Sequence, residues 1–269
     1  MIVCERESLL GGSLFFMPKK LFSHARYISF PFSKEYIKKG GQNLDTFLYF
    51  FYLAGYVALF IWGITLANKY GWLSASNVLL LVIFGLIVDN TLLALGRYIG
   101  TGHFLESISY ARFWGHALFT PTLVLFAWDS LKKADIAWAQ RKLAKYISYV
   151  LVIALICFEL FTETLGLKLE ADWKYGVLSY TSSEPTSGPP IMVLIISLVL
   201  IISGFLIWRK QKWIGYLLGT VIMTIGSAVP LPIESDAYKN GFELILLISL
   251  LATKHFQDHE GQRHKTAFS

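Results

Sequence analysis

Long apolar stretches alternate with short polar segments along most of this chain. Each apolar stretch is about 20 residues long, the length that an α-helix needs to cross ~30 Å of hydrocarbon. Seven such stretches are predicted, at residues 47–67, 78–98, 113–131, 146–165, 190–208, 213–233 and 240–257. The pattern therefore predicts an all-α, polytopic integral membrane protein that forms a bundle of seven transmembrane helices.

The segments outside the spans divide the chain into three parts. Residues 1–46 are expected to form a basic N-terminal tail that can lie along the membrane interface, with Met17 as an alternative start. Residues 47–257 form the transmembrane domain, and residues 258–269 form a polar C-terminal tail. Pro121 is expected to kink the third helix because proline has no N–H to donate. The longest connection, 166–189, is predicted to be a loop that caps the bundle.

Composition agrees with a membrane location. The chain is 55% hydrophobic and only 16% charged, with a mean hydropathy of +0.53, whereas soluble chains carry roughly a quarter charged residues. This excludes a soluble enzyme. The net charge of +6 does not indicate a nucleic-acid partner, because basic residues beside membrane spans face anionic lipid. Two cysteines, Cys4 and Cys157, are too few for a disulfide framework or a cysteine-based zinc site.

The distribution of Lys and Arg predicts the orientation. These residues concentrate in the third-to-fourth connection, the fifth-to-sixth connection and the C-terminal tail, which all lie on one side of a seven-span chain. That side should be cytoplasmic by the positive-inside rule. We therefore expect a multi-pass protein of the cell membrane with a cytoplasmic C-terminus. The basic character of residues 1–46 opposes an external N-terminus.

Four ionisable residues within the predicted spans are the candidate catalytic groups: Asp89, His116, Glu159 and Glu163. Charged groups are costly in hydrocarbon and usually mark a functional site. Glu159 and Glu163 are four residues apart and share one helix face. Two close carboxylates would repel each other, so one is expected to stay protonated near neutral pH and to act as an acid.

Four further polar residues are candidates for substrate binding: Asn90, Arg97, Arg112 and Glu243. Each also has a structural interpretation. Asn90 can form an interhelical hydrogen bond, the two arginines can anchor helix ends at the interface, and Glu243 lies near enough to the interface to be solvated. The direction of each helix places six of these candidates in the half of the membrane opposite the basic connections: Asp89, Asn90, His116, Glu159, Glu163 and Glu243.

The leading functional hypothesis is a membrane-embedded enzyme that acts on a lipophilic isoprenoid or lipid by acid–base proton transfer, for example cyclisation, isomerisation or hydration. The expected partners are membrane lipids and this lipophilic substrate, with neither a cofactor nor a metal. The alternatives are a small proton-coupled transporter and a non-catalytic receptor or assembly protein. The sequence leaves the oligomeric state open. Aromatic side chains are expected to hold the apolar part of the substrate: Phe84, Phe119, Phe126, Phe158 and Phe161.

Overall fold

A computed structural model describes residues 44–184, 190–229 and 235–267. Nearly all of the predicted tail at 1–46 lies outside these segments. The described helices are α2 (Leu44–Tyr70), α3 (Leu79–Ile99), α4 (His103–Phe119), α5 (Leu123–Lys133), α6 (Lys142–Glu159), α7 (Ile191–Gln211), α8 (Gly215–Ala228) and α9 (Ala237–Ala267). Two strands, β1 (Leu169–Lys174) and β2 (Val177–Ser182), complete the fold.

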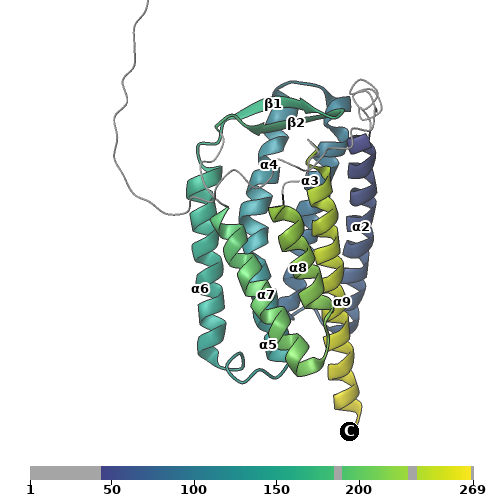
Figure 1. Cartoon of the computed structure of the whole chain (residues 1–269), viewed down its shortest axis with the longest axis vertical. Helices are drawn as coiled ribbons and strands as arrows, with labels where there is room; N and C mark the ends of the chain where they lie inside the picture. The colour runs from purple at the N-terminus through teal and green to yellow at the C-terminus, as the bar shows by residue number, and fades with distance from the viewer. Residues whose placement is uncertain (1–43, 185–189, 230–234, 268–269) are drawn as a thin grey trace, which may run out of the picture.

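The predicted helical membrane bundle is confirmed. The helices run up and down beside one another, and α4 and α5 together make one crossing, so the described segments cross the bundle seven times (Figure 1). Four helical segments are long and apolar enough to span a membrane: Leu44–Tyr70, Ala75–Ile99, Lys142–Thr164 and Ile191–Gln211. Helix α8 is apolar but shorter. The protein is therefore membrane-embedded.

The third crossing is broken at the predicted proline. A short 3₁₀ helix, Thr120–Thr122, separates α4 from α5, because Pro121 cannot donate the backbone hydrogen bond that a continuous α-helix needs. Beyond the break, every residue from Leu123 to Leu131 is buried. The break lets the upper half of this crossing line a cavity while the lower half forms core.

Small residues bring α8 and α9 into close contact. A side chain at Gly219 would overlap the hydroxyl of Ser249 on α9. Lipid tails are as apolar as leucine, so transmembrane helices associate largely through tight packing and interhelical hydrogen bonds. Glycine at this position permits the approach.

The connection predicted as a loop contains an antiparallel β-hairpin that covers one end of the bundle (Figure 1). Its turn residues, Tyr175 and Gly176, both have positive φ, as a type I′ hairpin turn requires. The Thr46 hydroxyl donates to the Gly176 carbonyl at 3.0 Å, and a side chain at Gly96 would overlap the Leu178 carbonyl oxygen. The hairpin is thereby held against α2 and α3.

The opposite end of the bundle is closed by a buried ionic network. Lys254, only 1% exposed, contacts Asp258 at 2.5 Å, and Asp258 also contacts Lys133 at 2.8 Å. Lys133 in turn pairs with Asp129 at 3.2 Å, which accepts the backbone N–H of Ser76 at 3.1 Å. The network requires α9 to continue past 257, where the sequence predicts that the span ends.

Candidate active site

A cavity of about 460 Å³ lies inside the bundle, toward the hairpin end. Along α3 and α9 the charged lining residues are nearer the hairpin and the apolar ones are deeper. On α3, Asp89 lies above Leu86 and Val82, and on α9, Glu243 lies above Leu247. The cavity therefore has a charged rim and an apolar floor.

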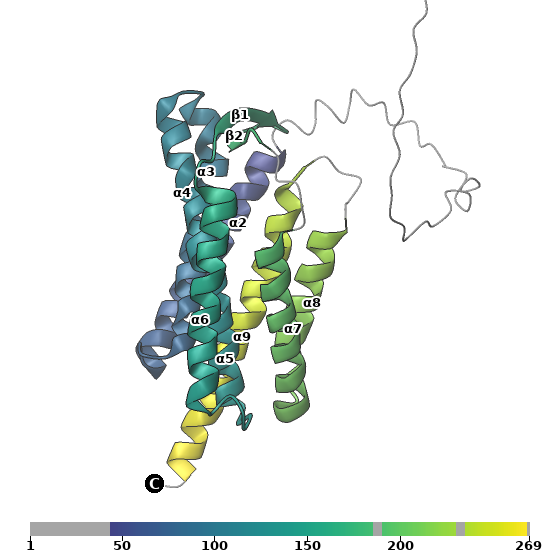
Figure 2. The same ribbon diagram turned by 90° about the vertical axis from the view of Figure 1, so that its left-hand side faces the viewer.

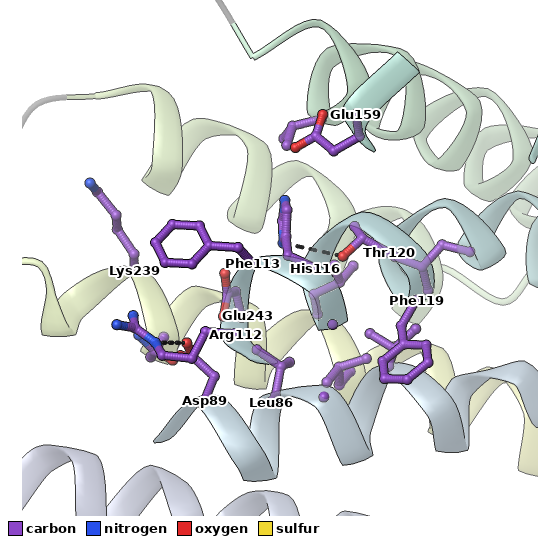
Figure 3. A pocket seen from close by; sticks show the side chains of 18 of the residues that line it. Leu86, Asp89, Arg112, Phe113, His116, Phe119, Thr120, Glu159, Lys239 and Glu243 are labelled. Carbon is purple, nitrogen blue, oxygen red and sulfur yellow. Dashed lines mark hydrogen bonds and ion pairs between the residues drawn. The ribbon is translucent and has the colours of Figure 1, made fainter. Parts of the chain in front are cut away.

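Six of the eight candidate residues from the sequence line this one cavity, and several are shown in Figure 3. They come from four crossings that are far apart in the sequence. They are Asp89 on α3, Arg112 and His116 on α4, Glu159 and Glu163 at the end of the α6 crossing, and Glu243 on α9. Asn90 and Arg97 do not line it.

Asp89 and Arg112 form an ion pair within the cavity wall. The Arg112 Nε donates to Asp89 Oδ1 at 2.6 Å, and the two side chains are only 18% and 23% exposed. The sequence treats these residues separately, as a catalytic candidate and a binding candidate. Their contact means that the positive charge of Arg112 is offset inside the protein.

His116 lies about one helical turn below Arg112 and also lines the cavity. Its Nδ1 is 3.3 Å from the Thr120 hydroxyl, and Asp89 is close enough to interact with it electrostatically. Figure 3 shows Glu159 facing His116 from the opposite wall. An imidazole and a carboxyl group thus face the same space, where a bound molecule could contact both.

The two glutamates lie at a local irregularity in the α6 crossing. After Glu159, residues Leu160–Thr164 form a turn of π-helix, and the N–H of Leu165 donates to the Leu160 carbonyl at 2.8 Å. Such turns occur often at functional sites. Glu159 and Glu163 both line the cavity, as their spacing predicts, although nothing in the sequence indicates the π turn.

Glu243 lies on α9 among the charged groups of the rim. Lys239 lies about one turn before it, and both residues line the cavity. Asp89 and Lys239 are the charged groups that act on it electrostatically. Glu243 is therefore part of the charged rim, although the sequence also allowed it to be an interfacial, solvated residue.

Asn90 forms the interhelical hydrogen bond that its structural interpretation predicts, and the interfacial role of Arg97 stays a prediction. The Asn90 amide donates to the Asn240 side chain at 2.9 Å and to the Leu86 carbonyl at 2.9 Å, so it links α3 to α9. The Arg97 guanidinium lies 5.6 Å from the centre of the Tyr98 ring near the end of α3. Asn240, which sequence reasoning did not single out, lines the cavity instead.

The aromatic lining differs from the expectation. Of the five predicted phenylalanines, Phe119 lines the cavity and Phe126 is fully buried in the core. Phe84, Phe158 and Phe161 are exposed on the bundle. The apolar floor consists mainly of aliphatic side chains. An apolar residue on a membrane helix can face lipid as readily as it can face a neighbouring helix. Its position in the sequence therefore does not show which of the two it faces.

A second, polar cavity of about 220 Å³ lies beneath the hairpin, and we call it the vestibule. It shares five residues with the main cavity: Asp89, Arg112, Lys239, Asn240 and Glu243. The hairpin contributes Asp172, Lys174, Val177, Ser179 and Thr181. The remaining lining residues are Asp45 and Tyr49 on α2, Leu93 on α3, and Asp236, which immediately precedes α9. Sequence reasoning missed the vestibule because its roof depends on the hairpin.

The roof of the vestibule carries an ion pair outside the membrane-spanning helices. Lys174 Nζ lies 2.7 Å from Asp172 Oδ2. The hydrogen bond and the negative charge of Asp172 raise the pKa of Lys174 above its usual value of 10.5. Lys174 therefore stays positively charged and paired throughout the physiological pH range.

Within residues 44–184, 190–229 and 235–267, no group of three or more His, Cys, Asp or Glu side chains has a geometry that could hold a metal ion. No known protein-family model matches the chain, and no curated protein matches it with significance.

Proposed function

We propose that this protein is a membrane-embedded enzyme that acts on a lipophilic isoprenoid or lipid by transferring protons. The observation that carries the proposal is the convergence of His116, Glu159, Glu163 and the Asp89–Arg112 pair on one cavity with an apolar floor. Acid–base catalysis needs a proton donor and a proton acceptor that can both reach the substrate. The cavity volume falls within the roughly 300–1,000 Å³ of small-molecule sites.

The positions of the groups suggest a role for each. Glu159 or Glu163 is the general acid, and His116, facing Glu159 across the cavity (Figure 3), is the base that later removes a proton. Asp89, ion-paired with Arg112, stabilises positive charge that develops on His116 or on the substrate. The apolar part of the substrate lies on the floor, against Phe119 and the leucines around it.

The test is untargeted lipid analysis of cells that carry or lack the gene, with variants in the cavity. Glu159→Gln, Glu163→Gln and His116→Gln preserve approximate size and hydrogen-bonding capacity while they remove proton-transfer groups. The variant that lacks the proton donor should accumulate a lipophilic precursor and still bind it. Glu106→Gln is the matched control, because Glu106 is also on α4 but lines neither cavity.

Two outcomes would count against the enzyme. Lipid profiles that are unchanged by gene deletion would exclude a lipid substrate. Wild-type behaviour of both glutamate variants, singly and together, would remove the pair from the site and leave only His116 and Asp89 as candidates.

A proton-coupled carrier is the second candidate, and the continuity of the vestibule with the cavity favours it. Charged groups lead from Asp172 and Lys174 on the hairpin, through Asp236 and Lys239, to Glu243 and the Asp89–Arg112 pair. Such a line of groups suits a proton relay. Liposomes containing the purified protein would distinguish the two functions, because a carrier supports pH-dependent flux that the glutamate variants abolish.

The arrangement of the bundle also supports an orientation. The α5–α6 connection, the α7–α8 connection and the C-terminal end of α9 lie at the end opposite the hairpin (Figures 1 and 2). These segments carry Lys132, Lys133, Arg141, Lys142, Lys145, Arg209, Lys210, Lys212 and Arg263. We infer from the positive-inside rule that this end is cytoplasmic and that the vestibule faces the other side.

A further inference from the structure

We propose that the vestibule is a binding subsite for the polar end of the substrate, and that this end is a hydroxyl or an amine rather than a phosphate or carboxylate. The inference rests on the proposed function, since it assumes that the main cavity holds a lipophilic molecule. It adds the chemical class of the headgroup.

Each of the three cationic groups that line the vestibule is already paired with an aspartate. Arg112 lies 2.6 Å from Asp89, Lys174 lies 2.7 Å from Asp172, and Lys239 lies 2.6 Å from Asp236. The charge of each cation is already offset by its aspartate, so an anionic headgroup gains less attraction from it than from an unpaired cation. The vestibule therefore offers an anion little electrostatic attraction.

Two further carboxyl groups line the vestibule, which gives it five carboxyl groups against three cationic groups. They are Asp45, which is 5% exposed, and Glu243. Among the described residues neither forms an ion pair with a lysine or arginine. A phosphate placed here would also approach the aspartates of the three ion pairs, and juxtaposed like charges cost several kcal/mol in binding.

The hairpin supplies neutral hydrogen-bonding groups to the same space. Val177, Ser179 and Thr181 alternate along β2 and line the vestibule, as residues on one face of a strand do. Asp172 lies opposite Ser179 in the strand register. Hydroxyl and carboxylate groups can bind a hydroxyl or an ammonium group without any rearrangement of the three ion pairs.

The two cavities together fit an amphiphile in one orientation. They meet at Asp89, Arg112, Lys239, Asn240 and Glu243, so a molecule with its apolar chain on the floor of the main cavity extends its polar end toward the hairpin. In that position its middle passes His116 and Glu159. The position of the headgroup then determines which carbon atoms of the chain reach the proton-transfer groups.

The experiment compares three probes with the same C20 isoprenoid tail: geranylgeraniol, geranylgeranylamine and geranylgeranyl phosphate. The full-length protein is placed in phosphatidylcholine nanodiscs, and each probe competes with radiolabelled geranylgeraniol. The alcohol, the amine or both should bind at least about tenfold more tightly than the phosphate, given the cost of like-charge contacts. The order of alcohol and amine identifies which of the two headgroups the vestibule prefers.

Asp172→Asn is the decisive variant because it leaves Lys174 without its carboxylate. It should improve binding of the phosphate about tenfold relative to binding of the alcohol. Glu260→Gln removes the same single charge from the far end of α9 and should change neither. If Asp172→Asn disrupts the hairpin, Asp236→Asn makes the same test through Lys239.

Each outcome separates the vestibule proposal from the enzyme proposal. Phosphate binding as tight as alcohol binding, or no gain in either aspartate variant, overturns the vestibule proposal and leaves the proton-transfer proposal standing. Headgroup selectivity combined with wild-type lipid profiles in the glutamate and histidine variants supports the subsite and overturns the enzyme. Failure of all three probes to bind overturns the vestibule proposal together with the assumption of a lipophilic ligand.

Discussion

Breaking the Asp89–Arg112 ion pair should destabilise the protein. From the sequence alone, removal of Asp89 is expected to cost little stability, because loss of an intramembrane acid spares its desolvation cost. The structure changes this expectation, because loss of Asp89 leaves the guanidinium of Arg112, which is only 18% exposed, without its partner.

The size of the effect follows from the geometry. For charge centres about 4 Å apart at an effective dielectric constant of about 20, the attraction is about 4 kcal/mol. Desolvation of the two groups and loss of side-chain freedom offset roughly half of it. We therefore expect a coupling free energy of about 2 kcal/mol, and each single variant should lower Tm by roughly 5 °C.

A double-mutant cycle measures this coupling directly. Asp89→Asn, Arg112→Gln and the double variant are compared with wild type by thermal unfolding in detergent, and the double variant should be more stable than the sum of the single losses predicts. The control cycle uses Lys168 and Glu184, whose contact at 3.4 Å is largely exposed and should show almost no coupling. Additive losses at Asp89 and Arg112 would refute the reasoning.

Three further predictions concern the ends of the bundle. Gly96→Val should displace the hairpin and accelerate amide hydrogen exchange across residues 169–182. Gly261→Ala, where the added side chain meets open space, should not change this exchange. Equal exchange rates in the two variants would contradict the described packing of the hairpin on α3. Asp258→Asn should cost about 3–5 kcal/mol, because it leaves Lys254 buried without a carboxylate. Lys254→Met should cost less stability than Asp258→Asn, because Asp258 keeps its contact with Lys133. A larger loss of stability in Lys254→Met, measured by thermal unfolding, would refute the network. Reporters fused to the α5–α6 and α7–α8 connections and to the C-terminus should all read cytoplasmic, and a reporter in the hairpin should read the opposite side.

The helices could be predicted from the sequence because each depends on local properties of the chain. Apolar stretches of about 20 residues satisfy their own backbone hydrogen bonds in a membrane only as helices. A rise of 1.5 Å per residue then sets the depth of each side chain. This is why Asp89, His116, Glu159 and Glu243 could be placed at one level, and why Pro121 could be identified as a break.

Only the tertiary structure decided which of these groups touch. Depth along a helix follows from the sequence, but the rotation of each helix about its axis depends on packing against all its neighbours. Arg112 contacts Asp89 and Asn90 contacts Asn240 for that reason. Lys254 shows the same dependence. It lies at the end of an apolar stretch, where the sequence favours a solvated side chain, but α5 and the continuation of α9 bury it.

The hairpin and the vestibule beneath it could not be predicted from the sequence either. Strands β1 and β2 are short and lack a standard turn dipeptide, and their docking depends on the absence of a side chain at Gly96, which is distant in the chain. The composition and periodicity of the chain determined an α-helical membrane protein with polar groups at one depth. The three-dimensional packing decided that six of the candidate groups share a cavity and that this cavity continues into the vestibule. Both depend on contacts between distant segments, which arise only when the whole bundle assembles.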